Sequence, residues 1–512
     1  MHIVDLFRRQ AERFPDSPAY YFNGETYTWS ELYRRSSALA AALQAAGVNK
    51  GDGVAIIGGE GINSIETWYA CLLSGALRIG LNPRFTAVEL RAVLDKAQPR
   101  VLLASADQFD KVQQAADVLG LEPLLIGDDS GTLDMSVVKR LDDGADSAQL
   151  VAVPHNDDDE VAVIFTSGST GLPKGIVYAN DQVLQAVEQV HLGFGLTKND
   201  VFIRSLPTFG LGILYASMNV YLGYPCVLME RFDVEEKLKL IERYGATAFF
   251  GSGTILQWIA SFDRLDEYDL SSLRIAGYGQ APASPALIRK FNDRLSCGLY
   301  QVYGMTETHG FSAMLDWADH QEALETAPHR LESCGRPMPH VDIEVVGPDG
   351  EPLAAGEVGE IHIAGDVVSR GYRGPESEDG LKEGVVFTGD MGRFDSDGYL
   401  YMVDRKKFMI ITGGFNVYPV EVENVLAEHP AIDEVCVIGL EDQRWGQRIH
   451  AVLVAPDRDD YETLEAELME MAALKLAGFK MPKTIEFRDE LPHGATGKLL
   501  KGQIQNEYAN QD

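Results

Sequence analysis

A loop of glycines, hydroxyl side chains and one lysine is the stretch of this sequence best suited to chemistry. Residues 166–175 read Thr-Ser-Gly-Ser-Thr-Gly-Leu-Pro-Lys-Gly and directly follow the apolar run 161–165, which predicts a short buried strand. Glycines let backbone N–H groups approach an anion closely, Ser and Thr add neutral donors, and Lys174 supplies a positive charge. A flexible linker would need neither Pro173 nor a buried strand before it. The composition therefore predicts a phosphate-binding loop.

Further motifs follow this loop in order along the chain. They are residues 274–282 (Arg-Ile-Ala-Gly-Tyr-Gly-Gln-Ala-Pro), 301–308 (Gln-Val-Tyr-Gly-Met-Thr-Glu-Thr), 387–390 (Phe-Thr-Gly-Asp), 404–407 (Asp-Arg-Lys-Lys) and 491–499 (Leu-Pro-His-Gly-Ala-Thr-Gly-Lys-Leu). Together with the loop they resemble the adenylate-forming superfamily, which comprises acyl-CoA synthetases, the adenylation domains of peptide synthetases and beetle luciferases. The resemblance spans nearly the whole chain, and it implies ATP, Mg²⁺ and coenzyme A as cofactors.

The resemblance implies a catalytic set of four residues. Tyr303 offers an aromatic face for adenine, Thr306 a hydroxyl for the α-phosphate, and Glu307 a hard oxygen ligand for Mg²⁺. Lys498, in the terminal loop, corresponds to the catalytic lysine of the superfamily. The catalytic residues are thus expected to be Lys498, Thr306, Glu307 and Lys174, with Glu307 as the metal ligand.

Nucleotide and CoA are expected to contact residues spread over most of the motifs. A carboxylate at Asp390 can accept hydrogen bonds from both ribose hydroxyls, and by resemblance Arg405 contacts ribose and phosphate. Lys407 is expected at a hinge, and the Gly413-Gly414 turn at the channel for the pantetheine arm of CoA. The expected binding residues are Thr166, Ser167, Gly168, Ser169, Thr170, Gly171, Gly279, Gln280, Ala281, Tyr303, Gly304, Asp390, Arg405, Gly413 and Gly414.

The acyl pocket is where the sequence departs from the superfamily pattern. Gly210 stands where many acyl-CoA synthetases have histidine, Gly253 where proline is usual, and Gln280 where glycine is usual. No aspartate occurs within residues 206–215, which disfavours an α-amino acid as substrate. Phe209 could equally be a core residue, and a lone histidine such as His309 is more often simply packed. The expected pocket residues are Phe209, Gly210, Ser252, Gly253, Tyr278, Met305 and His309.

Alternating strand and helix signals supply the elements that must position these residues. Short apolar runs such as 54–57 and 101–103 alternate with helical patterns, which predicts a mainly parallel sheet with helices on both faces. Ligands gather at the carboxyl ends of strands in such sheets, which is where the phosphate loop falls. Asn23-Gly24 predicts a hairpin, and Thr28 with Glu31 predicts the start of a helix.

The expected fold class is α/β with two domains. A large N-terminal adenylation domain, residues 1–404, would hold parallel-rich βα-layered sheets and a small β-subdomain that includes the strand patterns 343–346 and 357–363. Residues 405–512 would form a small, mobile α+β C-terminal domain. The hinge is expected at residues 404–407. By resemblance, rotation about it would withdraw the lysine loop and bring the Gly413-Gly414 turn to the CoA channel.

Composition excludes several other classes of protein. The chain has 512 residues and a formal charge of -33, from 77 acidic and 44 basic residues, which disfavours nucleic acid as a partner. Its five cysteines are scattered singly, which predicts buried reduced thiols. Neither a signal peptide nor a membrane-spanning stretch is apparent, so a cytoplasmic protein without membrane insertion is expected. The acidic run 157–160 is expected to be a solvated connector rather than a metal site.

The expected reaction joins two anions, a carboxylate and the α-phosphate of ATP. Two like charges near 4 Å repel by roughly 4 kcal/mol at an effective dielectric of about 20, so cations are required. The first hypothesis is an AMP-forming acyl-CoA synthetase for an aromatic or medium-chain carboxylic acid. The alternative is a stand-alone adenylation enzyme that loads a carrier protein. A luciferase-like relative is a third, less favoured possibility. The sequence leaves the acid and the oligomeric state open.

Overall fold

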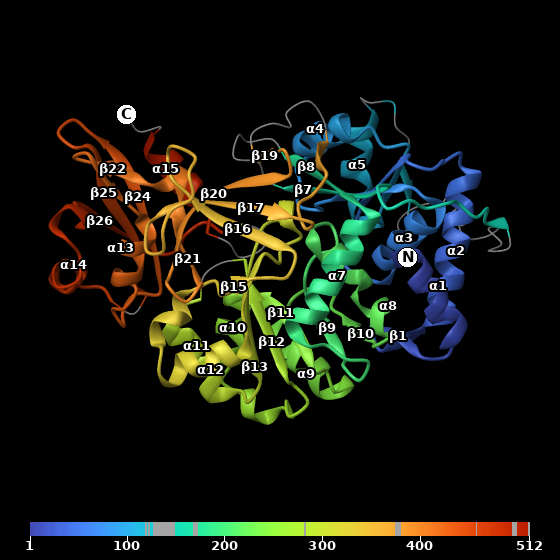
Figure 1. The fold of residues 1–512 in the computed structure, drawn as a ribbon, viewed down its shortest axis with the longest axis horizontal. Coiled ribbons are helices and arrows are strands. Elements are labelled where there is room, and N and C mark those ends of the chain that lie inside the picture. Colours follow the sequence, from blue (N-terminus) through green and yellow to red (C-terminus); the bar gives the residue numbers. More distant parts are fainter. Residues whose placement is uncertain are drawn as a thin grey trace. The chain divides into compact units, whose positions relative to one another are not determined.

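The computed structural model describes residues 1–117, 120, 123–125, 149–166, 173–280, 283–373, 380–456, 458–493 and 499–509. They form two compact units, the first made of Met1–Ile343 with Ile363–Val386 and the second of Glu344–His362 with Phe387–Asp512 (Figure 1). The expected α/β fold class is confirmed, with parallel-rich sheets in the larger unit. The domain border at Asp404 and the hinge that follows it remain predictions.

The first sheet of the larger unit has nine strands in the order β15-β14-β13-β12-β11-β9-β10-β1-β2. The strands from β13 to β1 are parallel to their neighbours, whereas β14, β15 and β2 pair antiparallel. Their bounds are β1 Pro18–Phe22, β2 Glu25–Thr28, β9 Phe202–Arg204, β10 Cys226–Leu228, β11 Ala248–Ser252, β12 Ile275–Gly279, β13 Gly298–Tyr303, β14 Ala313–Leu315 and β15 Arg336–Pro337.

The second sheet has the order β18-β8-β7-β4-β3-β5-β6. The strands from β7 to β6 are parallel, and β8 and β18 form an antiparallel edge. Their bounds are β3 Gly53–Ile57, β4 Leu77–Leu81, β5 Val101–Ala104, β6 Pro123–Leu125, β7 Glu160–Thr166, β8 Lys174–Ala179 and β18 Gly371–Arg373. The parallel centres of both sheets follow from the alternation of strand and helix in the sequence, because parallel neighbours require crossover connections.

Helices cover the parallel strands and close their cores. One core packs α9, α10 and α11 on the first sheet, and another packs α4 and α5 on the second. The helices of this unit are α1 Ile3–Arg13, α2 Trp29–Ala45, α3 Ile62–Ser74, α4 Ala87–Ala97, α5 Phe109–Ala116, α7 Asn180–Phe194, α8 Met218–Leu222, α9 Val234–Tyr244, α10 Gly253–Ala260, α11 Pro285–Arg294 and α12 Trp317–Glu325.

Two local sequence signals form as predicted. Asn23 and Gly24 have φ of 49° and 83° and join β1 to β2 as a tight antiparallel hairpin. Thr28 caps α2, because its side-chain oxygen accepts a hydrogen bond from the backbone N–H of Glu31 at 3.3 Å. These contacts join the first two strands and fix the start of α2.

Two further sheets contain the strands of the second unit. One has the order β16-β17-β20-β19 with β21 on β20, and the border between the units passes within β16, β17 and β20. The other has the order β23-β22-β25-β24 with β26 on β25. The bounds are β16 Val341–Val346, β17 Gly359–Gly365, β19 Leu381–Lys382, β20 Val385–Phe394, β21 Leu400–Arg405, β22 Ile410–Thr412, β23 Phe415–Val417, β24 Glu434–Asp442, β25 Gly446–Val454, β26 Thr484–Arg488, α13 Pro419–Leu426, α14 Tyr461–Ala473 and α15 Lys501–Ala509.

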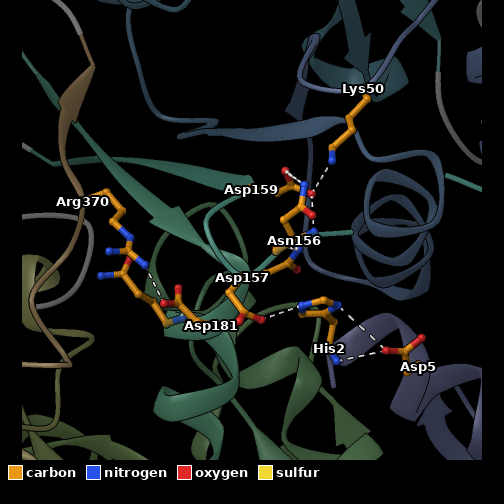
Figure 2. A network of polar contacts seen from close by, with 10 residues as sticks. His2, Asp5, Lys50, Asn156, Asp157, Asp159, Asp181 and Arg370 are labelled. Atoms are coloured by element: carbon orange, nitrogen blue, oxygen red, sulfur yellow. Dashed lines mark hydrogen bonds and ion pairs between the residues drawn. The ribbon is translucent and has the colours of Figure 1, made fainter. Parts of the chain in front are cut away.

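The acidic connector before β7 is tied down by basic side chains. Figure 2 shows Asp157 next to His2, whose Nε2 lies 2.9 Å from the Asp157 carboxylate, and Asp159 paired with Lys50 at 2.6 Å. The backbone N–H of Asn156 also donates to Asp159 at 2.8 Å. These contacts give the acidic residues structural partners.

The remaining expectations from composition concern thiols and membrane spans. All five cysteines are buried and free. Burial raises the pKa of Cys71 and Cys226 to about 12, so these thiols are unreactive at neutral pH. Among the helices that the structure describes, none has the length and apolarity needed to cross a membrane.

Candidate active site

The two ends of the predicted phosphate loop meet across an antiparallel strand pair. β7 ends at Thr166, β8 begins at Lys174, and these two residues are register partners. The loop therefore starts and ends at one point, the carboxyl end of β7. Five residues assigned to nucleotide binding lie outside the described residues, namely Ser167, Gly168, Ser169, Thr170 and Gly171.

The second predicted phosphate segment is a single 3₁₀ turn, Thr306–Thr308, that follows β13. Its backbone is held from two sides. Tyr178 in β8 donates its hydroxyl proton to the carbonyl of Thr306, and the backbone N–H of Ser369 donates to the carbonyl of Glu307 at 2.8 Å. The second sheet thus fixes a turn that the first sheet carries.

Tyr372 in β18 lies between two of the predicted catalytic residues. Its hydroxyl donates to Oε1 of Glu307 at 3.0 Å, and Nζ of Lys174 lies 5.4 Å from the centre of its ring. Burial, and then the charge of Glu307, raise the pKa of Tyr372 well above its ordinary value, so the hydroxyl stays protonated and remains a donor. The structure brings Lys174 and Glu307 together around a tyrosine that the sequence analysis did not identify.

A polar groove of about 930 Å³ runs beside Tyr372. Its walls are residues of α7 and of the segments 365–372 and 381–384, including Asp181, Arg370 and Lys382. Arg370 and Asp181 form an ion pair at 2.5 Å, labelled in Figure 2. Both charge signs line the groove, so it suits a charged ligand better than an apolar acid.

Close backbone packing explains the glycines of the predicted nucleotide site. A Cβ on Gly304 would lie 2.5 Å from the backbone of Gly310, and a Cβ on Gly279 would lie 2.6 Å from a carbonyl oxygen of β13. Gln280, which follows β12, has φ of +68°, in the left-handed region that favours glycine. That backbone conformation is the physical reason why glycine suits this position.

His309, predicted to face the substrate, is fully buried at φ of +58°. Its ring lies 4.9 Å from the ring of Tyr178. Within the described residues, neither ring nitrogen has a hydrogen-bond partner. Burial lowers the pKa of His309 to about 3, so the imidazole is neutral at physiological pH and has one donor and one acceptor.

The other predicted pocket residues lie near the carboxyl ends of β9 and β11. Phe209 and Gly210 are partly buried in the loop before the 3₁₀ segment Leu211–Ser217. Ser252 accepts a hydrogen bond from the backbone N–H of Ile255 at 3.3 Å and so caps α10, whose first residue is Gly253. The carboxyl ends of parallel strands are where a ligand of this kind of sheet is expected.

Tyr278 and Met305 differ in what they can offer a substrate. The Tyr278 side chain packs in the core, where its hydroxyl lies 2.9 Å from Nε2 of His320. Only the backbone of Tyr278 is therefore placed to face a pocket. Met305 holds the turn after β13, because its carbonyl accepts a hydrogen bond from the N–H of Gly310 at 2.8 Å.

An apolar cavity adjoins the Phe209 loop, residues 205–212, which leads from the end of β9 into the 3₁₀ segment. It measures about 10 Å³, room for roughly one water molecule, so an acyl group would have to displace wall side chains. One charged residue, Arg204, belongs to the lining. The full lining is Val190, Phe194, Phe202, Arg204, Ser205, Leu206, Tyr215, Met218, Phe250 and Phe311.

In the second unit, the structure brings together the two residues assigned to ribose. Asp390 in β20 and Arg405 in β21 are register partners, and Nε of Arg405 lies 2.5 Å from Oδ1 of Asp390. The carboxylate is buried and the guanidinium is about two-fifths exposed. Next to them, burial lowers the pKa of Lys407, whose Nζ lies 4.9 Å from the Phe408 ring centre.

The predicted CoA turn is a two-residue hairpin. Gly413 and Gly414 join β22 to β23 with φ of 58° and 83°, values that favour glycine. The N–H of Gly413 donates to the carbonyl of Trp445 at 2.8 Å. Ala281 and Lys498, assigned to nucleotide binding and catalysis, lie outside the described residues.

Comparison with known families and proteins gives matches along nearly the whole chain. Residues 7–373 match the family described as AMP-binding enzyme, and residues 421–498 match the AMP-binding enzyme C-terminal domain. A feruloyl-CoA synthase from Amycolatopsis sp is 35% identical over 505 residues, which cover 98% of this chain and 98% of that relative. The fatty acid–acyl-carrier-protein ligase ScoC from Streptomyces coeruleorubidus is 32% identical, with 99% of this chain and 96% of that relative covered.

Solved structures agree with this fold. The amide bond synthetase McbA from Marinactinospora thermotolerans has a TM-score of 0.87 against this chain, at 28% sequence identity. The alignment covers 99% of this chain and 100% of that one. Similarity thus extends over both units and is not confined to the motif-bearing loops.

Proposed function

We propose, from the premise that the chain belongs to the AMP-binding enzyme family, that it activates an aromatic or medium-chain carboxylic acid and transfers the acyl group to CoA. The family falls within the adenylate-forming superfamily, and the chain is by class an AMP-forming acid–thiol ligase. The acid would be activated as its acyl adenylate with release of pyrophosphate, and AMP would leave when the thioester forms.

The observation that carries this proposal is the arrangement of Lys174 and Glu307 on either side of Tyr372. The attack of a carboxylate on the α-phosphorus brings two anions together, which requires cations and donors in place beforehand. Lys174 would supply one cation at the triphosphate. Glu307, oriented by the Tyr372 hydroxyl, would bind the metal ion that accompanies ATP.

The residues present fit a magnesium ion that enters with its nucleotide. Among the described residues, no three His, Cys, Asp or Glu side chains are grouped to hold a metal by themselves. Mg²⁺ commonly binds one or two carboxylates and takes its other ligands from phosphates and water, so Glu307 alone is a suitable protein ligand. When bound, the ion would neutralise phosphate charge.

The second half-reaction requires an acceptor that reaches the acyl adenylate before water does. We assign this role to the thiol of CoA, with the Gly413-Gly414 turn beside the pantetheine arm. The change between half-reactions would occur at residues 404–407. At the start of this segment, the Asp404 carboxylate accepts a hydrogen bond from the backbone N–H of Val420 at 2.9 Å. This contact ties β21 to the first turn of α13.

A carrier protein is the second candidate acceptor. ScoC, which shares 32% identity with this chain, is named as a ligase of fatty acids to acyl-carrier protein. The first half-reaction would be identical. Only the thiol that receives the acyl group would differ.

The test is AMP formation with a panel of aliphatic and aryl carboxylic acids, each with ATP and Mg²⁺, with and without CoA. Multiple turnovers that depend on CoA are expected for one class of acid. Adenylation that stops after one turnover despite CoA would favour the carrier protein. The absence of both AMP and ATP–pyrophosphate exchange with every acid would refute the proposal.

Lys498→Ala tests the catalytic assignment separately. We expect loss of ATP–pyrophosphate exchange, while transfer to CoA from a supplied acyl adenylate is retained, because the lysine is needed for the first half-reaction alone. Lys475→Ala offers a matched control outside the loop, because the Lys475 side chain is about half exposed and pairs with Glu428 on the surface. Exchange near the wild-type rate in Lys498→Ala would refute the role of this lysine.

A further inference from the structure

Two arginines of the larger unit are buried in strands that are otherwise apolar. Arg78 lies in β4 with 1% of its surface exposed, and Arg204 ends β9 with 5% exposed. Arginine keeps its charge in proteins, so burial is costly unless the guanidinium meets acceptors. The contacts of these two side chains therefore need an explanation.

Arg204 is only half satisfied by the protein. Its Nη2 donates to the carbonyl of Gly212, which anchors the end of the Phe209 loop. Its Nη1 is buried and has no hydrogen-bond partner among the described residues. Arg204 also belongs to the lining of the apolar cavity, between aromatic side chains such as Phe250 and Tyr215.

Arg78 is even less satisfied. Its one hydrogen bond is long, from Nη2 to the hydroxyl of Ser64 at 3.5 Å. Its Nε and Nη1 are buried and lack partners within the described residues. Burial lowers the pKa of Arg78 to about 10, which still leaves the guanidinium charged at physiological pH.

One carboxylate faces the two cations. Glu60 acts electrostatically on both Arg78 and Arg204, but its hydrogen bonds go elsewhere. Its Oε1 accepts the backbone N–H of Thr208 at 2.8 Å and the Thr208 hydroxyl at 3.1 Å. Burial raises the pKa of Glu60, so its ionised form is disfavoured. Even when Glu60 is ionised, the cluster holds one positive charge in excess.

The cluster lies behind the region assigned to the acyl group. Ser64 and Glu60 hold Thr208, the residue before Phe209, since the Ser64 and Thr208 hydroxyls lie 2.6 Å apart. Tyr215, which also lines the cavity, donates its hydroxyl proton to the carbonyl of His309 at 2.9 Å. Arg204 lines the cavity, and a Cβ on Gly80 would lie 2.9 Å from Nη1 of Arg78 and 2.5 Å from the carbonyl oxygen of Phe209, so both guanidinium groups lie close to the predicted acyl pocket.

We propose that Arg204, supported by Arg78, binds a second carboxylate of the acid substrate, so that the enzyme activates dicarboxylic acids with an apolar middle. This inference rests on the proposed function. A carboxylate accepts several N–H donors at once and would supply the missing negative charge. The aromatic walls of the cavity would have to move apart to admit the apolar middle of the molecule and would then pack against it.

The experiment compares linear dicarboxylic acids, from butanedioate to decanedioate, with monocarboxylic acids of the same chain lengths. Arylalkanoic acids with and without a ring carboxyl group form a second matched set. AMP formation gives kcat and KM for each acid. We expect wild type to prefer the diacid of one length, and Arg204→Met to lower kcat/KM for that diacid by about 10- to 100-fold. Monoacids should change by less than about 3-fold.

Arg264→Met is the matched control, because Arg264 is about half exposed and pairs with Glu235 on the surface. This variant should leave kcat/KM for both diacids and monoacids unchanged. If Arg204→Met fails to fold, Arg204→Lys and Arg78→Met take its place. Both keep a side chain of similar length but remove the forked donors.

Calorimetric titration of the preferred diacid into wild type and Arg204→Met, without ATP, separates this inference from the proposed function. Weaker binding in the variant supports the subsite even if no acid is adenylated. Wild type that prefers monoacids at every length, or an Arg204→Met variant that loses monoacids and diacids equally, overturns the subsite while leaving the ligase proposal standing.

Discussion

Two sets of buried charges in the larger unit follow opposite rules. Asp200 is 3% exposed, and its carboxylate accepts hydrogen bonds from Arg274, Thr197 and Thr247, including two from the Arg274 guanidinium at 2.7 and 2.5 Å. Arg78 and Arg204 have one hydrogen bond each and buried N–H groups without partners in the described structure. The first set is complete within the protein, and the second is not.

The difference separates a structural role from a binding role. A buried carboxylate with all its hydrogen bonds, such as Asp200 beside the partly exposed Arg274, needs nothing further, and its loss should reduce stability. A buried cation that lacks acceptors adds little to stability but can bind an anion strongly. Substitution of the paired carboxylate should therefore change the free energy of unfolding. Substitution of an unpaired arginine should change it little.

The largest loss of stability is expected for Asp200→Asn. Burial alone would raise the pKa of Asp200, but hydrogen bonds from Arg274, Thr247 and Thr197 outweigh it and lower the pKa to about 2. The variant removes this charge, so we expect a loss of about 2–3 kcal/mol, seen as a lower melting temperature at neutral pH. Activity per folded molecule should be unchanged, because the hydrogen-bond partners of Asp200 are Thr197, Thr247 and Arg274, none of which is a predicted site residue.

The pH dependence gives an independent check on Asp200. A pKa below the unfolded value means that the ionised carboxylate stabilises the fold above about pH 4, and that this stabilisation is lost as the pH falls toward 2. The stability difference between wild type and Asp200→Asn should therefore shrink over this range. A difference independent of pH would show that the pair contributes nothing through its charge.

Lys237 tests a third way to bury a cation. It is fully buried in α9, where Nζ donates to the Ser205 hydroxyl at 3.2 Å and lies 4.5 Å from the Phe249 ring centre. Burial lowers its pKa to about 7. Unlike arginine, lysine can lose its proton, so this site needs no anion.

At any pH below the pKa of Lys237 in the unfolded chain, burial of this lysine should lower the stability of the fold relative to a neutral side chain. The unfolded chain binds the proton more tightly, so wild-type stability should rise as the pH increases from about 7 to 10. Lys237→Met should be more stable at neutral pH by on the order of 2–5 kcal/mol and should lack this rise. Chemical denaturation across that range measures it, with Lys239→Met, on the exposed face of the same helix, as control.

Gly212 and Gly210 test how firmly the Phe209 loop holds the arginine cluster. A Cβ on Gly212 would lie 2.3 Å from the carbonyl oxygen of Pro207, whereas a Cβ on Gly210 meets nothing closer than 3.8 Å. Gly212→Ala must shift the carbonyl that Arg204 contacts. We expect it to cost about 1–3 kcal/mol, and Gly210→Ala less than about 1 kcal/mol. Equal melting temperatures would contradict the close packing of the loop.

These tests bear on how much the sequence could predict. The alternation of strand and helix was enough for the parallel centres of both sheets, but the antiparallel edges at β8 and β18 depend on pairing between distant segments. Residues with distinctive chemistry in short motifs, such as Glu307, could be named from type and order. Tyr372 could not, because its importance comes from contacts with Glu307 and Lys174, which no local pattern encodes.

Arg78 and Arg204 were missed for a related reason. Each is a single charge in an apolar run, and such a residue in a sequence can as well turn outward or end a strand. Only the structure shows that both are buried and that their N–H groups lack partners. The departures that the sequence did reveal, such as Gly210, indicate the region of substrate choice without giving its chemistry.

The smallest stability effect is expected for Arg204→Met. Arg204→Met replaces a buried guanidinium by an apolar side chain of similar length, which removes one hydrogen bond to Gly212 and also removes an uncompensated charge. These two effects oppose each other, so we expect the free energy of unfolding to change by less than about 1 kcal/mol, with a correspondingly small shift in melting temperature. A titration of wild type with the preferred diacid should raise its melting temperature, and the same diacid should leave Arg204→Met unchanged. A loss of stability as large as that of Asp200→Asn, without any effect of the diacid on wild type, would mean that the two sets of charges are alike and that Arg204 is structural.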